Sequence, residues 1–248
     1  MPVRYLARRT GLAQYVNTAY PGFDLTIPDQ VRADMWISEF QSYIKTGQMP
    51  ALEIVYLPRD HTAGTRPGWC TPRACVADND LALGRMVDAL SHSAFWKSTL
   101  MLVVEDDAQS GTDHVDSHRS IMLAVSPYTH SGTVHRFVNT TDVLATIEEV
   151  LGLAPLSQFD RYGRPLHDVW SATPDLRPYS AIQPAQRVDE RNPSRGVAAE
   201  ESRNLNLAEA DRVDDMQFNR LLWRAIKGAR TPYPTTRRAS TLDFARDR

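Results

Sequence analysis

Residues 98–119, STLMLVVEDDAQSGTDHVDSHR, constrain the fold of this chain more than any other stretch. Their first part, residues 100–104, is a short, unbroken apolar run that is rich in leucine and valine. This composition is typical of a strand that is buried on both faces of a parallel sheet covered by helices. Acids and histidines follow at once, and open α/β folds bind their ligands at the carboxyl edge of the sheet. The stretch therefore predicts one part of a metal-dependent active site.

A second apolar stretch, ALEIVYL at residues 51–57, repeats this pattern and is followed by Asp60 and His61. An amphipathic helix at residues 76–92 is expected to connect the two strands. Strand, crossover helix and strand form a βαβ unit, in which the two strands point the same way. We therefore expect Asp60 and His61 to lie at the same sheet edge as Asp106 and Asp107.

Other elements fit the same α/β plan. Helical spacing and a closing glycine predict a helix at residues 29–47, in which Asp29 can cap the first turn. Residues 121–125 are expected to form a third short strand, and residues 140–152 a further helix capped by Asn139 or Thr140. Together these elements predict an α/β fold with a parallel sheet covered by helices.

The pattern loosens towards the C-terminus. Prolines recur among charged residues and serines from residue 171 onward, without a sustained apolar period. We expect one domain at residues 1–170 and an extended, irregular tail at residues 171–248. A short helix near residues 215–228 is predicted to dock back on the core.

The two clusters together contain enough ligands for a divalent metal, and two ions would require roughly six to eight protein ligands. Three successive acids repel one another, and a bound cation relieves that repulsion. The candidate ligands are Asp60, His61, Asp106, Asp107, His114 and His118, with Glu105, Asp113 and Asp116 in reserve.

Each cluster by itself has an ordinary structural explanation. An Asp-His pair in a loop is commonly a capping acid beside a solvated histidine, and an acidic run is commonly a solvated turn. Asp78 and Asp80 are expected to face solvent or to stabilise the first turn of their helix. Only the occurrence of both clusters at successive strand ends favours a site.

Composition excludes several classes of function. The formal net charge of -2 and the lack of a basic stripe argue against nucleic-acid binding. No apolar run is long enough for a membrane span, and no signal peptide follows Met1, which would place the chain in the cytosol if Met1 is the true start. Cys70 and Cys75 are the only cysteines, too few for a zinc site of four thiolates. We expect them to be small, partly buried thiols.

Four stretches resemble the bacterial phosphoesterase family of the alkaline phosphatase-like superfamily, which is related to phospholipase C and acid phosphatases. They are DHTAGTRPG at 60–68, residues 71–96, VVEDDAQSGTDHVDSHR at 103–119 and VSPYT at 125–129, with further similarity at 151–160 and 219–228. The resemblance covers most of the chain from about residue 20 to residue 234. Arg59 departs from it, since a small polar residue is expected before the Asp-His pair.

The resemblance implies a fold with a partial, doubly wound and mostly parallel sheet and flanking helices. It also implies a hydrolase that acts on phosphate esters, either small molecules or phospholipids, with two divalent ions such as zinc, manganese or calcium. By motif position, Asp60, Asp106 and Asp107 would be metal ligands, together with His61, His114 and His118. Members of the family are often exported. The nucleophile of that superfamily lies in an N-terminal half, so this chain is expected to correspond to the C-terminal half. Three explanations stay open: a truncated reading frame, a separately encoded half that works with an N-terminal half as its partner, or a relic.

Three hypotheses remain open. The chain belongs to a metal-dependent phosphoesterase and carries part of the site, with Thr62, Ser110 and Thr112 as the nearest hydroxyls but none marked as the nucleophile. Alternatively, it is a catalytically inactive binding fragment that keeps the fold, or a complete metallohydrolase that attacks with metal-activated water and no protein nucleophile.

Overall fold

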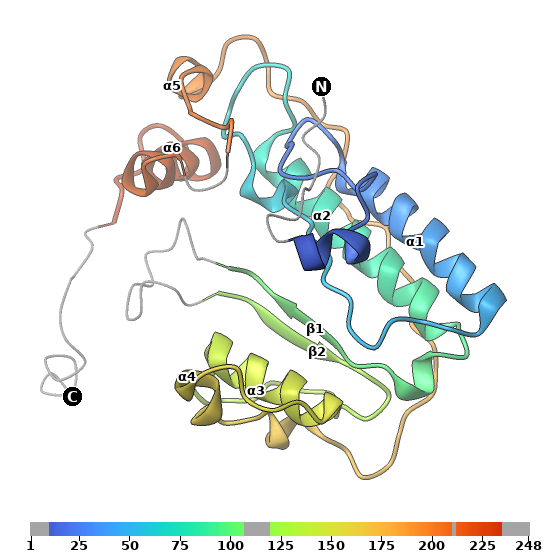
Figure 1. The fold of residues 1–248 in the computed structure, drawn as a ribbon. Coiled ribbons are helices and arrows are strands. Elements are labelled where there is room, and N and C mark those ends of the chain that lie inside the picture. Colours follow the sequence, from blue (N-terminus) through green and yellow to red (C-terminus); the bar gives the residue numbers. More distant parts are fainter. Residues whose placement is uncertain (1–9, 107–119, 210–211, 235–248) are drawn as a thin grey trace, which may run out of the picture.

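The computed structural model describes residues 10–106, 120–209 and 212–234, and its helices enclose a small sheet. Figure 1 shows α1 and α2 on one side of the sheet and α3 with α4 on the other. The longer helices and the strands are α1 (Asp29–Thr46), α2 (Pro72–Ser91), β1 (Met101–Val104), β2 (Met122–Val125), α3 (Thr140–Leu151) and α6 (Asp215–Lys227). Shorter helices are α4 (Gln158–Arg161), α5 (Ala199–Arg203) and the 3-10 turns η1 (Thr10–Tyr15), η2 (Arg59–His61), η3 (Trp96–Ser98) and η4 (His167–Val169).

The main core lies between α1 and α2. Trp36 and Phe40 of α1 stack with ring centroids 4.8 Å apart, and both pack with buried residues of α2 and with Trp96. Burying a large aromatic or aliphatic side chain contributes about 1.5–3 kcal/mol each. This pair of helices is therefore the stable base on which the sheet packs through Met101 and Val125.

The helix expected at residues 29–47 is confirmed, and Gly47 closes it in a left-handed conformation with φ of 69°. Its start differs from the prediction, because Pro28 occupies the cap position and Asp29 does not cap the first turn. The helix predicted at residues 140–152 is confirmed as α3, with Asn139 accepting hydrogen bonds from the backbone N–H groups of Thr141 and Asp142.

The sheet differs from the parallel one that was predicted. β1 pairs with β2 in antiparallel register, Val103 opposite Leu123, and these are the two strands of the described sheet. Both fall where the sequence predicts strands. Met101, Leu102 and Val103 of β1 are half-buried and Val104 is exposed, so β1 is not buried on both faces. The fold is therefore mixed helical and β, built on a small antiparallel sheet.

The strand predicted at residues 51–57 does not form, so the predicted βαβ unit was wrong. This segment runs without regular secondary structure beside α1. Side chains hold it there: the Glu53 carboxylate accepts a hydrogen bond from Trp36 Nε1 at 3.1 Å, and Leu57 O accepts one from Asn79 Nδ2 at 2.8 Å. Within the described part of the chain, the backbone N–H groups of residues 52–55 make no hydrogen bond. Ile54 is 91% exposed.

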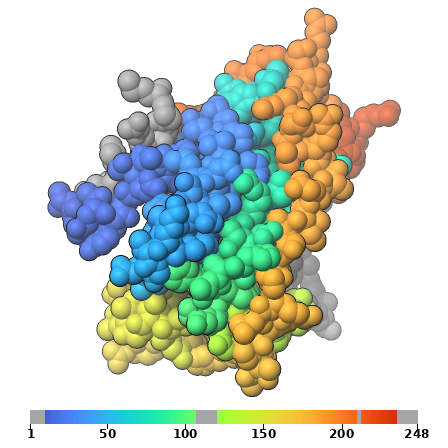
Figure 2. Space-filling view, turned by 90° about the vertical axis from the view of Figure 1, so that its right-hand side faces the viewer, coloured from blue at the N-terminus to red at the C-terminus, as the bar shows by residue number. Residues whose placement is uncertain are grey.

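The tail beyond residue 171 crosses the outer face of α2 and returns to its N-terminal end. Figure 2 shows this orange segment lying over the green surface of α2. Tyr179 N donates to Ser91 Oγ at 2.9 Å, and Ala181 N donates to Asp88 Oδ2 at 2.8 Å. α6 lies within the region for which a docking helix is expected, and it buries Phe218, Asn219, Leu221 and Leu222. The tail thus packs on the core over much of its length.

Candidate functional site

Asp60 and His61 lie in the short turn η2, directly after Arg59, and a buried polar network fixes this turn. The carboxylate of Asp29 at the start of α1 accepts a hydrogen bond from the backbone N–H of Arg59 at 3.0 Å. It also accepts one from Asn79 Nδ2 at 3.1 Å and pairs with Arg32 at 3.0 Å, both side chains being fully buried. The first turn of α1 and a residue two turns into α2 therefore set the position of the turn that carries the candidate ligands.

Arg59 and Asp78 form the second ion pair of this network. Arg59 Nη1 lies 3.3 Å from Asp78 Oδ2, and both side chains are 3% exposed. Asp78 Oδ2 also accepts a hydrogen bond from the backbone N–H of Asp29 at 2.7 Å. The prediction that Asp78 faces solvent or serves its own first turn was wrong, whereas Asp80 is exposed. Arg59 thus compensates the charge of Asp78 inside the protein.

Asp60 is electrostatically coupled to the end of β1. Burial, together with the nearby Glu105 and Asp29 carboxylates, raises the pKa of Asp60 to about 7. Repulsion of this kind acts between carboxylates that lie near one another. The structure therefore brings the first cluster close to Glu105, a residue the sequence held in reserve, although the two segments are not neighbouring parallel strands.

His61 is held between two aromatic rings. Phe23 meets it edge-on with centroids 5.4 Å apart, and Phe218 of α6 stacks on it at 5.3 Å with an interplanar angle of 26°. His61 Nδ1 lies 3.1 Å from the carbonyl oxygen of Thr62. A carbonyl can only accept, so this contact places the proton on Nδ1 and the lone pair on Nε2. Nε2 is the atom through which His61 could bind a metal.

Thr62 has a strained backbone beside these residues. Its φ of 61° with ψ of 179° is a combination that β-branched residues rarely adopt. The side chain is buried, and Thr62 Oγ1 accepts a hydrogen bond from the backbone N–H of Gly64 at 3.1 Å. The turn is thus held in a conformation that its surroundings impose.

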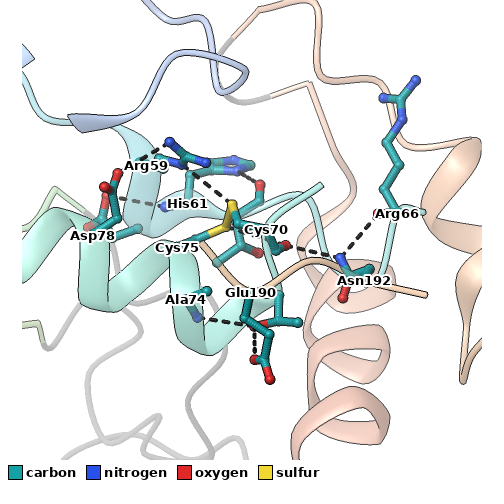
Figure 3. Close-up of a disulfide and its surroundings, with 12 residues drawn as sticks. Arg59, His61, Arg66, Cys70, Ala74, Cys75, Asp78, Glu190 and Asn192 are labelled. Carbon is teal, nitrogen blue, oxygen red and sulfur yellow. Dashed lines mark hydrogen bonds and ion pairs between the residues drawn. A yellow bond between two sulfur atoms is a disulfide. The ribbon is translucent and has the colours of Figure 1, made fainter. Parts of the chain in front are cut away.

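A disulfide lies beside the Arg59 side chain. Cys70 and Cys75 are bonded, and both are 1% exposed, so the prediction of two free thiols was wrong. Figure 3 shows Arg59 directed at this bridge, with Arg59 Nε 3.4 Å from Cys70 Sγ. The spacing of the two cysteines in the sequence did not indicate whether they form a disulfide or remain thiols. Their pairing depends on the backbone turn that leads into α2.

Asn192 ties the tail to the same region. Its Nδ2 lies 3.0 Å from Gly64 O, 3.1 Å from Arg66 O and 3.0 Å from Cys70 O (Figure 3). Asn192 N donates to Trp69 O at 2.8 Å, and Gly68 N donates to Asn192 O at 3.0 Å. Sequence reasoning missed Asn192, because a single asparagine in a proline-rich tail carries no periodic signal.

The predicted ligands are only partly brought together. Asp60 and His61 are adjacent in η2, and Asp106 follows β1 as an exposed residue. Asp107, His114 and His118 lie outside the described residues, as do Asp113 and Asp116. Across residues 10–106, 120–209 and 212–234, no group of three or more His, Cys, Asp or Glu side chains could hold a metal ion. The described residues near η2 thus provide fewer ligands than the four to eight that a divalent ion requires.

Comparison with family models, curated proteins and solved structures finds no match to this chain. Among the described helices, none is both long enough and apolar enough to cross a membrane.

Proposed function

We propose that this chain contributes divalent-metal ligands to the hydrolysis of phosphate esters. The observation that carries the proposal is that a buried polar network holds Asp60 and His61 side by side in η2, where the nearby Glu105 carboxylate also raises the pKa of Asp60. Asp60 and the acids that follow β1, Asp106 and Asp107, would be ligands, with His61, His114 and His118 as further donors. Zinc, manganese and calcium all fit a set of carboxylates and imidazoles. A cation there would neutralise these acids and polarise a phosphoryl oxygen.

The buried network supports this assignment because it gives the ligands a rigid base. Asp29 fixes the backbone of η2, and Arg59 is locked to Asp78. Ligands supported in this way lose little side-chain freedom when they bind a cation, which strengthens binding. The attacking group and the remaining ligands would come from a second polypeptide, the expected N-terminal half, and the substrate would be a small phosphate ester or a phospholipid.

Binding of Mn²⁺ to the full chain, measured by isothermal titration calorimetry, tests this proposal. Asp60→Asn removes the charge but keeps an oxygen that can accept the backbone N–H of His61, 3.1 Å from Asp60 Oδ1. We expect it to weaken Mn²⁺ binding by at least about tenfold, in the range seen when metal sites lose supporting groups. Asp80→Asn, a matched change at an exposed acid of α2, should leave the affinity unchanged.

Absence of Mn²⁺ binding, or equal binding by both variants, would overturn the metal site. Turnover of p-nitrophenyl phosphate then separates the remaining hypotheses. The chain alone should turn over little substrate, and a polypeptide that supplies the nucleophile should raise the rate. Fast metal-dependent turnover by the chain alone would instead show that it is a complete metallohydrolase.

A binding fragment without catalysis is the second candidate, and the segment at residues 51–57 favours it. Leu52 is 48% exposed and Ile54 91% exposed, beside backbone N–H groups that make no hydrogen bond within the described residues. An extended apolar segment with unpaired backbone groups is a template for strand pairing with another chain. This candidate predicts association without metal-dependent turnover.

A further inference from the structure

Residues 190–192 of the tail pair like a strand with the loop at residues 68–71, which leads into α2. Thr71 N donates to Glu190 O at 3.1 Å, and Thr71 Oγ1 donates to the Glu190 carboxylate at 2.8 Å. Cys70 forms an antiparallel β-bridge with the same stretch of the tail. The tail is therefore bound to this loop by the kind of hydrogen bonds that join neighbouring strands.

The side chain of Asn192 holds this loop in shape. Its Nδ2 lies within 3.1 Å of three carbonyl oxygens, those of Gly64, Arg66 and Cys70. Asn192 is 6% exposed, so removal of its amide would leave buried carbonyl groups without this donor, which is unfavourable. The conformation of the loop and the position of the tail thus depend on each other.

The disulfide constrains the same loop from the side of α2, as Figure 3 shows. Cys75 lies near the start of that helix, and its bond to Cys70 limits the movement of Cys70, whose carbonyl oxygen is 3.0 Å from Asn192 Nδ2. A loop that is already held in its bound shape loses less entropy when a segment docks on it. The bridge and the docked tail should therefore stabilise each other, each by the same factor.

Cys70 has surroundings that suit the thiolate released when the bridge breaks. Arg59 Nε lies 3.4 Å from Cys70 Sγ, and a guanidinium beside a sulfur stabilises a thiolate. Both cysteines of the bridge are 1% exposed, so a reductant reaches them only when the packing around the loop opens. The tail is part of that packing, and the bridge is therefore open to exchange with a thiol mainly when the tail is undocked.

We propose that the Cys70–Cys75 bridge is a redox switch for the docking of residues 190–192, and that its reduction by a dithiol loosens the tail. In the exchange, a thiolate of the dithiol attacks Cys75 Sγ, the S–S bond breaks, and Cys70 leaves as a thiolate beside Arg59. The second thiolate of the dithiol then displaces Cys75, so the dithiol becomes a cyclic disulfide and the protein gains two electrons and two protons. The switch requires no metal and does not rest on the hydrolysis of phosphate esters.

Hydrogen–deuterium exchange of the full wild-type chain, with and without dithiothreitol, tests the switch. The backbone N–H of Asn192, which donates to Trp69 O at 2.8 Å, reports on docking. Reduction should speed its exchange by about fivefold or more beyond any change in the amides of α3, which lies on the other side of the sheet. The double variant Cys70→Ser, Cys75→Ser should exchange at the reduced rate in both buffers.

The reciprocal effect is measured from the tail. Asn192→Ala should shift the thiol–disulfide equilibrium with dithiothreitol towards the reduced protein by the same factor, measured by thiol alkylation and mass spectrometry. Gln183→Ala, at an exposed position of the tail, is the control and should keep the wild-type equilibrium. Glu190→Ala removes only the carboxylate that Thr71 Oγ1 contacts. It should cause a smaller shift in the same direction, and it replaces Asn192→Ala if that variant does not fold.

Either of two results would overturn the proposal. If the Asn192 amide and the α3 amides respond equally to dithiothreitol, the bridge does not control docking of the tail. If the folded tail variants keep the wild-type thiol–disulfide equilibrium, docking of the tail does not stabilise the bridge.

Discussion

Acidic side chains in this protein differ in how their charge is compensated. Asp29 and Asp78 are buried, but each lies beside an arginine, at 3.0 Å and 3.3 Å respectively. Removing one partner from such a buried pair typically costs about 3–5 kcal/mol, because the other charge is left without compensation. Glu53 and Asp60 are partly buried without an arginine, and desolvation is the largest cause of the raised pKa of each. Folding stability should therefore depend on pH through both of these acids.

Glu53→Gln is expected to stabilise the chain at neutral pH. Burial raises the pKa of Glu53 above its ordinary value, so the folded chain keeps a proton that the unfolded chain has already lost. Its contribution to stability is complete below the unfolded value of 4.5 and is lost as pH rises through the folded value. Glutamine keeps the oxygen that accepts the hydrogen bond from Trp36 Nε1 and does not titrate.

Urea unfolding of wild type and Glu53→Gln at pH 4 and pH 7 measures this effect. The free energy of unfolding of the variant, relative to wild type, should increase with pH. Asp80→Asn, an exposed acid on α2, is the control that should show no such change. A constant difference between wild type and Glu53→Gln at both pH values would contradict the expected burial of this carboxyl.

At the scale of elements, helices were predictable from the sequence and the sheet was not. The helices α1 and α3 follow from local signals, namely apolar spacing, a closing glycine and, for α3, the Asn139 cap. Short apolar runs predicted the positions of β1 and β2 but not their direction, because strand pairing depends on contacts distant in sequence. Residues 51–57 share the composition of a strand, yet the Glu53 and Leu57 contacts hold them against helices.

The residues of the candidate site could likewise be predicted only in part. Asp60, His61 and the acids after β1 were predicted from the sequence because two strands were expected before them, and only β1 is a strand in the structure. Asp29, Asn192 and Phe218 were not, since each acts on η2 from a distant element. Glu105 was considered only in reserve, although it is the acid whose coupling to Asp60 the structure supports.

The disulfide between Cys70 and Cys75 closes a short loop at the start of α2 and should stabilise the folded chain. The double variant Cys70→Ser, Cys75→Ser should lose about 2 kcal/mol of unfolding free energy, the chain-entropy value for so short a loop. Reductant should lower the unfolding midpoint of wild type to a similar extent and leave the double variant unchanged. Equal stabilities of wild type and the double variant in oxidising buffer would show that the bridge contributes nothing.

On the scale of the whole molecule, the tail connects regions that the sequence keeps far apart. It crosses α2, joins the loop after η2 through Asn192 and includes α6, which lies beside His61. The segment at residues 51–57 is, in contrast, left without a pairing strand in the described structure. The tail thus covers part of α2, whereas the segment at residues 51–57 exposes apolar side chains.

Ile54→Lys tests whether that exposed segment mediates association. Ile54 is 91% exposed, so the change should alter the free energy of unfolding by less than about 0.5 kcal/mol. Sedimentation velocity should show association of wild type that increases with concentration and is reduced in the variant. A matched change at Val31, which is 42% exposed on α1, should have no effect. A monomeric wild-type chain at all concentrations would contradict this prediction.

The long sequence distance between the tail and η2 sets the order in which the parts of the site are acquired. Ser202 and Thr65 are separated by 137 positions, and Asn192 and Cys70 by 122. A ribosome adds about 5–20 residues per second, so η2 would wait on the order of 10 s for the segments that cover it. During that interval the nascent chain has α1 and α2 but lacks Phe218. The orientation of His61 is therefore among the last native features to form during biosynthesis.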